Sequence, residues 1–256
     1  MNGIVSRLSA LSKAWLGLAA GALALIILNL ALPGSSLFFP LVSLWLDLAL
    51  FLLALVVLRV AGVELDLFHR AVLAGVWAAA LLYAFWALGS RTFLYYWDYA
   101  NYILKQYSTE AAFLQGAGVG FRFVFDSITE DYTNFISLFT EFPFCLSGKT
   151  GDDYAFCQVF SILPTLLVLL AGLVLKAGQM LRVKNRFWFF LIGLSWTLTY
   201  PWLRMSAMLG QPDWFGLIFA FSILLLTLDF RFEKLDPVRF VLLFSATAAI
   251  ILSRRW

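Results

Sequence analysis

The chain has 256 residues, of which 62% are hydrophobic, 18% aromatic and only 13% charged. This composition is more apolar than the core of a water-soluble domain of this length requires, so it excludes an ordinary soluble protein and predicts a membrane protein. The net charge of +3 is small, and the basic residues lie beside apolar segments. The sequence therefore contains no basic face for nucleic acid.

Seven apolar segments are long enough to cross about 30 Å of hydrocarbon. Each is expected to be a helix, because lipid offers the backbone no hydrogen-bond partner. The first exceeds the length of a signal-peptide core and no small-x-small cleavage motif ends it, so we expect it to be a span. The predicted fold is all-α, one polytopic membrane domain over residues 1–256. The segments lie near residues 14–32, 37–60, 71–88, 159–175, 187–203, 214–228 and 240–252.

The distribution of lysine and arginine predicts the orientation, because these residues are enriched in cytoplasmic loops. With a cytoplasmic amino terminus, one side of the membrane holds Arg7, Lys13, Arg59, Arg70, Lys176, Arg182, Lys184, Arg186, Arg231, Lys234 and Arg239. The other side holds Arg91, Lys105, Arg122, Lys149, Arg204, Arg254 and Arg255. The first set is larger and occupies shorter loops. We therefore expect a multi-pass protein of a bacterial inner membrane, although Arg254 and Arg255 leave the orientation of the last span open.

Residues 89–158 form a long segment between the third and fourth spans and hold more than half of the 15 acidic residues. This orientation makes the segment periplasmic or external. Tyr99, Tyr102, Ile103 and Tyr107 recur at helical spacing, which predicts an amphipathic helix lying flat at the membrane interface. A second helix is expected from Phe121 to about Phe142, after a break at the glycine-rich residues 116–120.

Asp98 is the main candidate for a catalytic group. It follows a span end by about ten residues and stands among aromatic residues in Tyr95-Tyr96-Trp97-Asp98-Tyr99. Partial exclusion of water makes a carboxylate a stronger base. The alternative is that Asp98 caps the helix that follows it.

Glu130 and Asp131 form a second acidic site. They could hydrogen-bond to sugar hydroxyls, or Asp131 could hold a divalent cation such as Mg²⁺ or Mn²⁺. Neighbouring helical residues point about 100° apart, so we expect at most one to face a cavity. The alternative is a solvated acidic turn.

Further charged residues border the external ends of spans. Arg91, Arg122 and Arg204 could neutralise a phosphate, or they could snorkel to the interface. Asp213 directly precedes a predicted span, where it could cap the helix or contact a substrate.

Three remaining features bound the chemistry. Cys145 and Cys157 lie on the predicted external side with eleven residues between them, where a disulfide or two packed thiols would fit. Asp47 stands inside the second apolar segment without an evident basic partner, and intramembrane carboxylates are functional candidates. His69 is the single histidine, which excludes a histidine-based metal site or triad.

These motifs resemble the GT-C superfamily of membrane glycosyltransferases, and in particular bacterial cell-surface and O-antigen glycosyltransferases. The resemblance rests on Trp97-Asp98-Tyr99-Ala100-Asn101-Tyr102 outside a span, the flat helices that follow, and Asp131-Tyr132 before the next span. It implies that Asp98 is the catalytic base. Three departures are a Gln211 where relatives often carry a basic residue, three spans before the acidic segment, and a short chain. The chain would be a compact or truncated member, or one that a protein partner completes.

The resemblance implies an inverting transfer of a sugar from a polyprenyl-phosphate donor to a lipid or glycan acceptor of the cell envelope. An external enzyme has no nucleotide sugar available, which agrees with a lipid-linked donor. The alternative is a non-catalytic membrane scaffold, an assembly subunit of a polysaccharide-handling complex that binds its partner through the aromatic external helices.

Overall fold

The computed structural model describes residues 2–90, 98–130, 133–148, 154–199, 213–228 and 237–253. Within these ranges every regular element is helical, which confirms the predicted all-α class. The elements are α1 (Asn2–Ala31), α2 (Phe38–Val60), α3 (Leu67–Ser90), α4 (Asp98–Leu114), α5 (Ala117–Asp126), the 3-10 turn η1 (Ser127–Thr129), α6 (Ser137–Ser147), α7 (Tyr154–Ser161), α8 (Leu163–Met180), α9 (Arg186–Leu198), α11 (Asp213–Thr227) and α12 (Pro237–Ser253).

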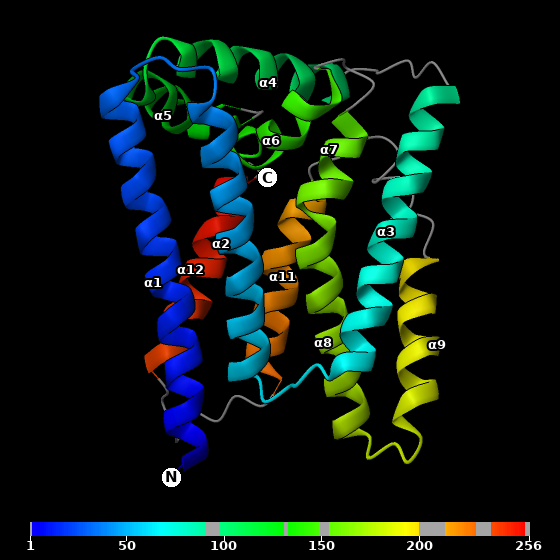
Figure 1. The fold of residues 1–256 in the computed structure, drawn as a ribbon. Helices are drawn as coiled ribbons and strands as arrows, with labels where there is room; N and C mark the ends of the chain where they lie inside the picture. Colours follow the sequence, from blue (N-terminus) through cyan, green and yellow to red (C-terminus); the bar gives the residue numbers. More distant parts are fainter. Residues whose placement is uncertain are drawn as a thin grey trace.

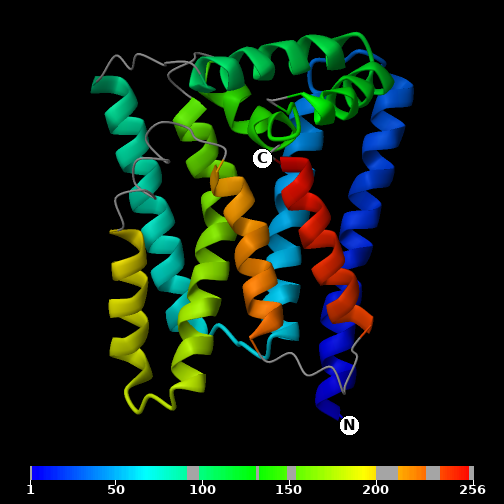
Figure 2. The same ribbon diagram turned by 180° about the vertical axis from the view of Figure 1, so that it is seen from behind.

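The helices form an upright bundle with a layer across one end. Helices α1, α2, α3, α8, α9, α11 and α12 stand side by side, while α4, α5 and α6 lie across the bundle (Figure 1, and from behind in Figure 2). We call α4, η1, α5 and α6 the outer layer. Helix α1 begins at the end opposite the outer layer, and α12 ends near it.

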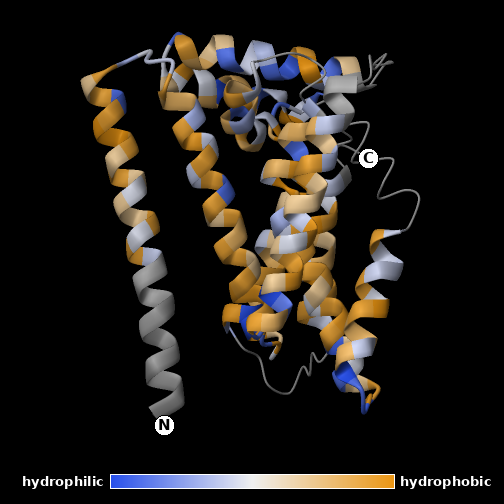
Figure 3. Cartoon of the chain, turned by 45° about the vertical axis from the view of Figure 1, so that its right-hand side comes forward, coloured by the Kyte–Doolittle hydropathy of each residue, from blue (hydrophilic) through white to orange (hydrophobic). Residues whose placement is uncertain are grey.

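Three helical stretches of the described chain are long and apolar enough to cross a membrane, namely Phe38–Val60, Leu67–Trp86 and Leu163–Met180. Shorter apolar helices stand beside them, and the predicted apolar segments fall within helices, to within about one residue at each end, with two exceptions. Residues 159–175 are divided between α7 and α8, and residues 200–203 lie outside the described part of the chain. Hydrophobic residues dominate the upright helices, and polar ones gather in the outer layer and the loops at the opposite end (Figure 3). The chain is therefore a multi-pass membrane protein.

Helix α8 lies at the centre of the bundle and α3 at its margin. In the most apolar 18-residue stretch of each helix, 61% of the stretch is buried in α8 but only 6% in α3. Pro164 at the start of α8 lacks a backbone N–H, and the chain turns at Ile162 between α7 and α8. The indole nitrogen of Trp77 in α3 donates to the Val159 carbonyl at this joint, 3.1 Å away. Helix α3 is thus hydrogen-bonded to the end of α7, next to the turn that precedes α8.

Two basic side chains tie other helices to the carboxyl end of α2. Lys176 of α8 is buried and its Nζ donates to the Ala61 carbonyl at 2.7 Å. Arg239 of α12 donates to the Val60 carbonyl at 3.0 Å. The last carbonyls of a helix carry partial negative charge, so these cations both satisfy and stabilise that end.

The outer layer differs from the prediction in one element. The expected helix from Phe121 to Phe142 is wrong as a single helix, because α5 and η1 end at Thr129 and α6 begins at Ser137. Of the expected break at residues 116–120, only Gly116 breaks the chain, with a φ of 138°. Gly120 lies inside α5, where a Cβ atom would collide with the ring of Phe113. That glycine lets α5 pack closely on α4.

Candidate functional site

One face of α4, which carries both apolar and polar side chains, is buried against the rest of the protein. Tyr102, Ile103, Gln106 and Phe113 recur at three- and four-residue steps and are all buried, which confirms the predicted amphipathic helix. Leu104 on the opposite face is 63% exposed. Helix α4 begins at Asp98, whose side chain lies outside the described part of the chain.

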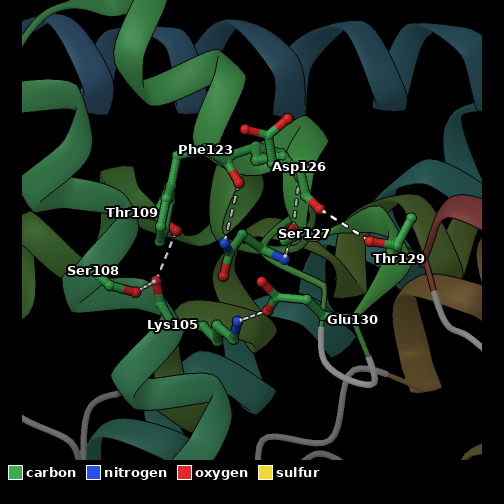
Figure 4. Close-up of polar contacts among 10 residues, drawn as sticks. Lys105, Ser108, Thr109, Phe123, Asp126, Ser127, Thr129 and Glu130 are labelled. Carbon is green, nitrogen blue, oxygen red and sulfur yellow. Dashed lines mark hydrogen bonds and ion pairs between the residues drawn. The ribbon is translucent and has the colours of Figure 1, made fainter.

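An ion pair joins α4 to the second acidic site. Lys105 of α4 contacts Glu130, directly after η1 (Figure 4). Lys105 follows Asp98 by seven residues, about 10 Å along a helix axis. This contact thus connects α4, which begins at Asp98, with the Glu130 site. Glu130 pairs with a lysine of the protein itself.

Side-chain hydrogen bonds fix the chain on both sides of residues 131–132. The Ser127 hydroxyl donates to the Val124 carbonyl and accepts from the Asn134 N–H, at 2.7 Å each. The Asn134 side-chain amide donates to the Phe123 carbonyl at 3.4 Å (Figure 4). These bonds replace the backbone pattern of a continuing helix, which explains why α5 stops here.

A buried polar cluster lies beneath α4, and the sequence reasoning missed it. The Gln106 amide donates to Glu141 Oε2 at 2.5 Å, and its oxygen accepts from the Thr140 hydroxyl at 2.6 Å. All three side chains are fully buried. Glu141 stands among Phe139, Phe142 and Phe144, so a lone acid in an apolar helix was the available signal.

Tyr154 of α7 extends the cluster toward the central helices. Its side chain is 1% exposed, and burial raises the pKa of its hydroxyl beside Gln158. The cluster therefore connects α4, α6 and α7.

The two cysteines lie on either side of residues 149–153, which are outside the described part of the chain. In the structure both are thiols, the second of the two arrangements that the sequence left open. Cys145 donates to Glu141 Oε1 at 3.1 Å, while Cys157 is fully buried on α7. The buried carboxyl of Glu141 therefore orients the thiol of Cys145.

The remaining predicted site residues separate into two groups. Arg122 is described: it is an exposed residue of α5 that pairs with Asp126 one turn later, at 3.6 Å. Asp213 is the first residue of α11, but its side chain lies outside the described part. Arg91, Asp131 and Arg204 also lie outside the described residues. The tentative metal ligand Asp131 is thus not placed, and the described residues hold no cluster of three or more metal-type side chains.

A second site lies on the side of the bundle, between α2, α3 and α8. It is a cavity of about 960 Å³ lined mainly by leucine, valine and aromatic side chains. Asp47 lines it, as the sequence position inside a span indicated, together with Ser161 and Thr165. No partner within the described chain meets hydrogen-bond geometry with the buried oxygens of these three groups, although Ser161 lies close enough to the Asp47 carboxyl to interact with it. Arg59, Glu64 and Arg70 line the end of the cavity that lies farthest from the outer layer.

The comparisons with known proteins give no relative: no family profile, curated protein or solved structure matches the chain significantly. The GT-C resemblance therefore rests on the quoted residues alone.

Proposed function

We propose that this chain is a seven-span protein of a bacterial inner membrane with its amino terminus in the cytoplasm and its outer layer outside. The upright arrangement of α1, α2, α3, α8, α9, α11 and α12 supports this topology. The cationic contacts at the carboxyl end of α2, which lies away from the outer layer, agree with the excess of basic residues on the cytoplasmic side.

The proposed activity is that of a GT-C-type glycosyltransferase, with Asp98 as the general base. The observation that supports it is the contact of Lys105 with Glu130, which links α4, whose first residue is Asp98, to the residue that directly precedes Asp131-Tyr132 in the sequence. The buried bonds of Gln106 hold α4 on the bundle two turns from Asp98. Such rigid support is what a positioned catalytic group requires.

In the proposed step, Asp98 accepts the proton of an acceptor hydroxyl while that oxygen attacks the anomeric carbon of a polyprenyl-phosphate sugar. The bond between the anomeric carbon and the phosphate oxygen breaks on the opposite face, so the configuration inverts. Arg91, Arg122 or Arg204, with a divalent cation on Asp131, would offset the charge that develops on the phosphate.

The test is a sugar-transfer assay with purified protein, polyprenyl-phosphate sugars and membrane-derived acceptors. Asp98→Asn should lower the rate by about 10²- to 10⁴-fold, the usual contribution of a positioned base. Asp66→Asn is the matched control, because this exposed carboxylate directly precedes α3, at the end of the bundle opposite the outer layer.

An Asp98→Asn protein that is folded and fully active would remove the proposal. Retention of a stoichiometric protein partner without any transfer would favour the scaffold.

A further inference from the structure

We propose that the lateral cavity between α2, α3 and α8 binds one chain of an anionic phospholipid, whose phosphate lies against Arg59 and Arg70. The basic end of the cavity lies at the opposite end of the upright helices from the outer layer, and the inference does not depend on the proposed transferase activity.

The size and lining of the cavity fit a hydrocarbon chain. Its volume of about 960 Å³ is at the upper end of the range typical of ligand pockets, about 300–1,000 Å³. Leu44, Leu48, Phe51 and Leu55 supply one wall from α2, and Leu73 and Trp77 supply the other from α3. An apolar space of this size beside lipid gains contacts when a chain fills it.

An opening of the cavity between α2 and α3 would face lipid, because both helices are candidate membrane spans. Helices α2 and α3 both pack against α8, and α3 is the least covered of the long apolar helices. The cavity occupies the space between α2 and α3, with α8 behind it. A lipid can therefore enter sideways, without passing through water.

Charge at the mouth selects the kind of lipid. Arg59 and Arg70 line this end of the cavity together with one acid, Glu64, which leaves one net positive charge. The Nε of Arg70 donates to the Leu65 carbonyl at 3.0 Å and so fixes the direction of its guanidinium. Basic pockets between spans at the cytoplasmic surface bind anionic headgroups. A zwitterionic lipid would bind less tightly to the same site, because its headgroup has no net negative charge.

The inner end of the cavity limits the depth of the chain. Asp47 lies twelve residues before Arg59 on α2, about 18 Å along the helix. Its carboxyl lies near the Ser161 hydroxyl, but neither these groups nor the Thr165 hydroxyl has a partner in hydrogen-bond geometry among the described residues. A methyl terminus would stop before these groups, because covering them without a partner costs free energy.

The experiment is lipid retention measured by native mass spectrometry of the full chain, taken from phosphatidylcholine nanodiscs that contain a minor fraction of phosphatidylglycerol. The wild type should retain one phosphatidylglycerol in preference to phosphatidylcholine. Arg59→Gln with Arg70→Gln should lower this retention about tenfold or more. Arg186→Gln, a basic residue at the same end but outside the cavity lining, is the matched control.

A second pair of variants tests the cavity itself. Ala74 lines the cavity, whereas Ala78, one turn further along α3, is exposed and does not. Ala74→Trp should abolish retention and Ala78→Trp should leave it unchanged. Equal retention of both lipids by the wild type, or unaltered retention in both the arginine variant and Ala74→Trp, would overturn the proposal.

Discussion

The polar groups beneath α4 and those in the lateral cavity are both buried, yet they differ in their bonding. Gln106, Thr140 and Glu141 bond to one another at 2.5–2.6 Å between two helices of the outer layer. Asp47, Ser161 and Thr165 stand beside open space without such bonds. A buried polar group that is satisfied within the protein serves its folding, whereas one that is unsatisfied beside a cavity identifies a place for a ligand or water.

The largest effect should come from breaking the satisfied cluster. Gln106→Leu removes the amide donor of the buried Glu141 and the acceptor of Thr140, and should lower the free energy of unfolding by about 3 kcal/mol. Thermal unfolding in detergent measures it. The isosteric Gln106→Glu would be informative as a comparison, since it places two carboxyls together. A Gln106→Leu protein as stable as the wild type would show that the cluster does not hold α4.

The packing of the outer layer can be tested at its glycines. Gly120→Val should destabilise the fold by about 1–3 kcal/mol, because the new side chain would meet the ring of Phe113. Gly118 of the same helix has open space around its Cβ position, so Gly118→Ala should be neutral or slightly stabilising. The two unfolding temperatures should therefore move in different directions. Similar losses in both would contradict the close approach of α5 to α4.

The cavity should respond in the opposite sense to the cluster. Asp47→Leu removes a carboxylate that makes no hydrogen bond within the described chain, so stability should stay the same or rise by about 1–2 kcal/mol. The measurement is again the unfolding temperature, taken in lipid-free detergent so that no bound chain contributes. A large loss of stability would mean that Asp47 is held by contacts like those of Glu141.

The smallest effect concerns the exposed end of α3. The Asp66 carboxylate accepts from the His69 N–H at 2.9 Å, and this bond lowers the Asp66 pKa. A lowered pKa in the folded state adds stability above the unfolded value of about 3.9, and this contribution is lost as the pH falls through the folded value. Asp66→Asn keeps a cap at every pH. The stability advantage of the wild type over this variant should therefore shrink below about pH 4, which an unfolding series across pH 3–6 would detect.

The sequence predicted the upright helices and α4, but neither the break between α5 and α6 nor the polar contacts between helices. Apolar runs and the spacing of Tyr102, Ile103 and Gln106 predict the upright helices and the buried face of α4 because both follow from local periodicity. Gln106 and Glu141 are 35 residues apart in the sequence, so local periodicity cannot predict their pairing. The bond between Ser127 and Asn134 at the end of α5 depends on a turn, which local periodicity does not predict either. Asp47 was recognised as unusual, but its cavity arises only from how α2 and α3 diverge around α8.

Helix α2 must also be inserted into the membrane with a carboxylate near its middle. Leucine, valine and phenylalanine account for sixteen of its 23 residues. Each favours the bilayer centre by about 0.3–0.6 kcal/mol in translocon scales, against roughly 2.5–3.5 kcal/mol of opposition from one aspartate. The surplus of apolar residues thus allows the insertion machinery to accept α2 unaided, and an acidic side chain can be kept within the bilayer without help from a neighbouring span.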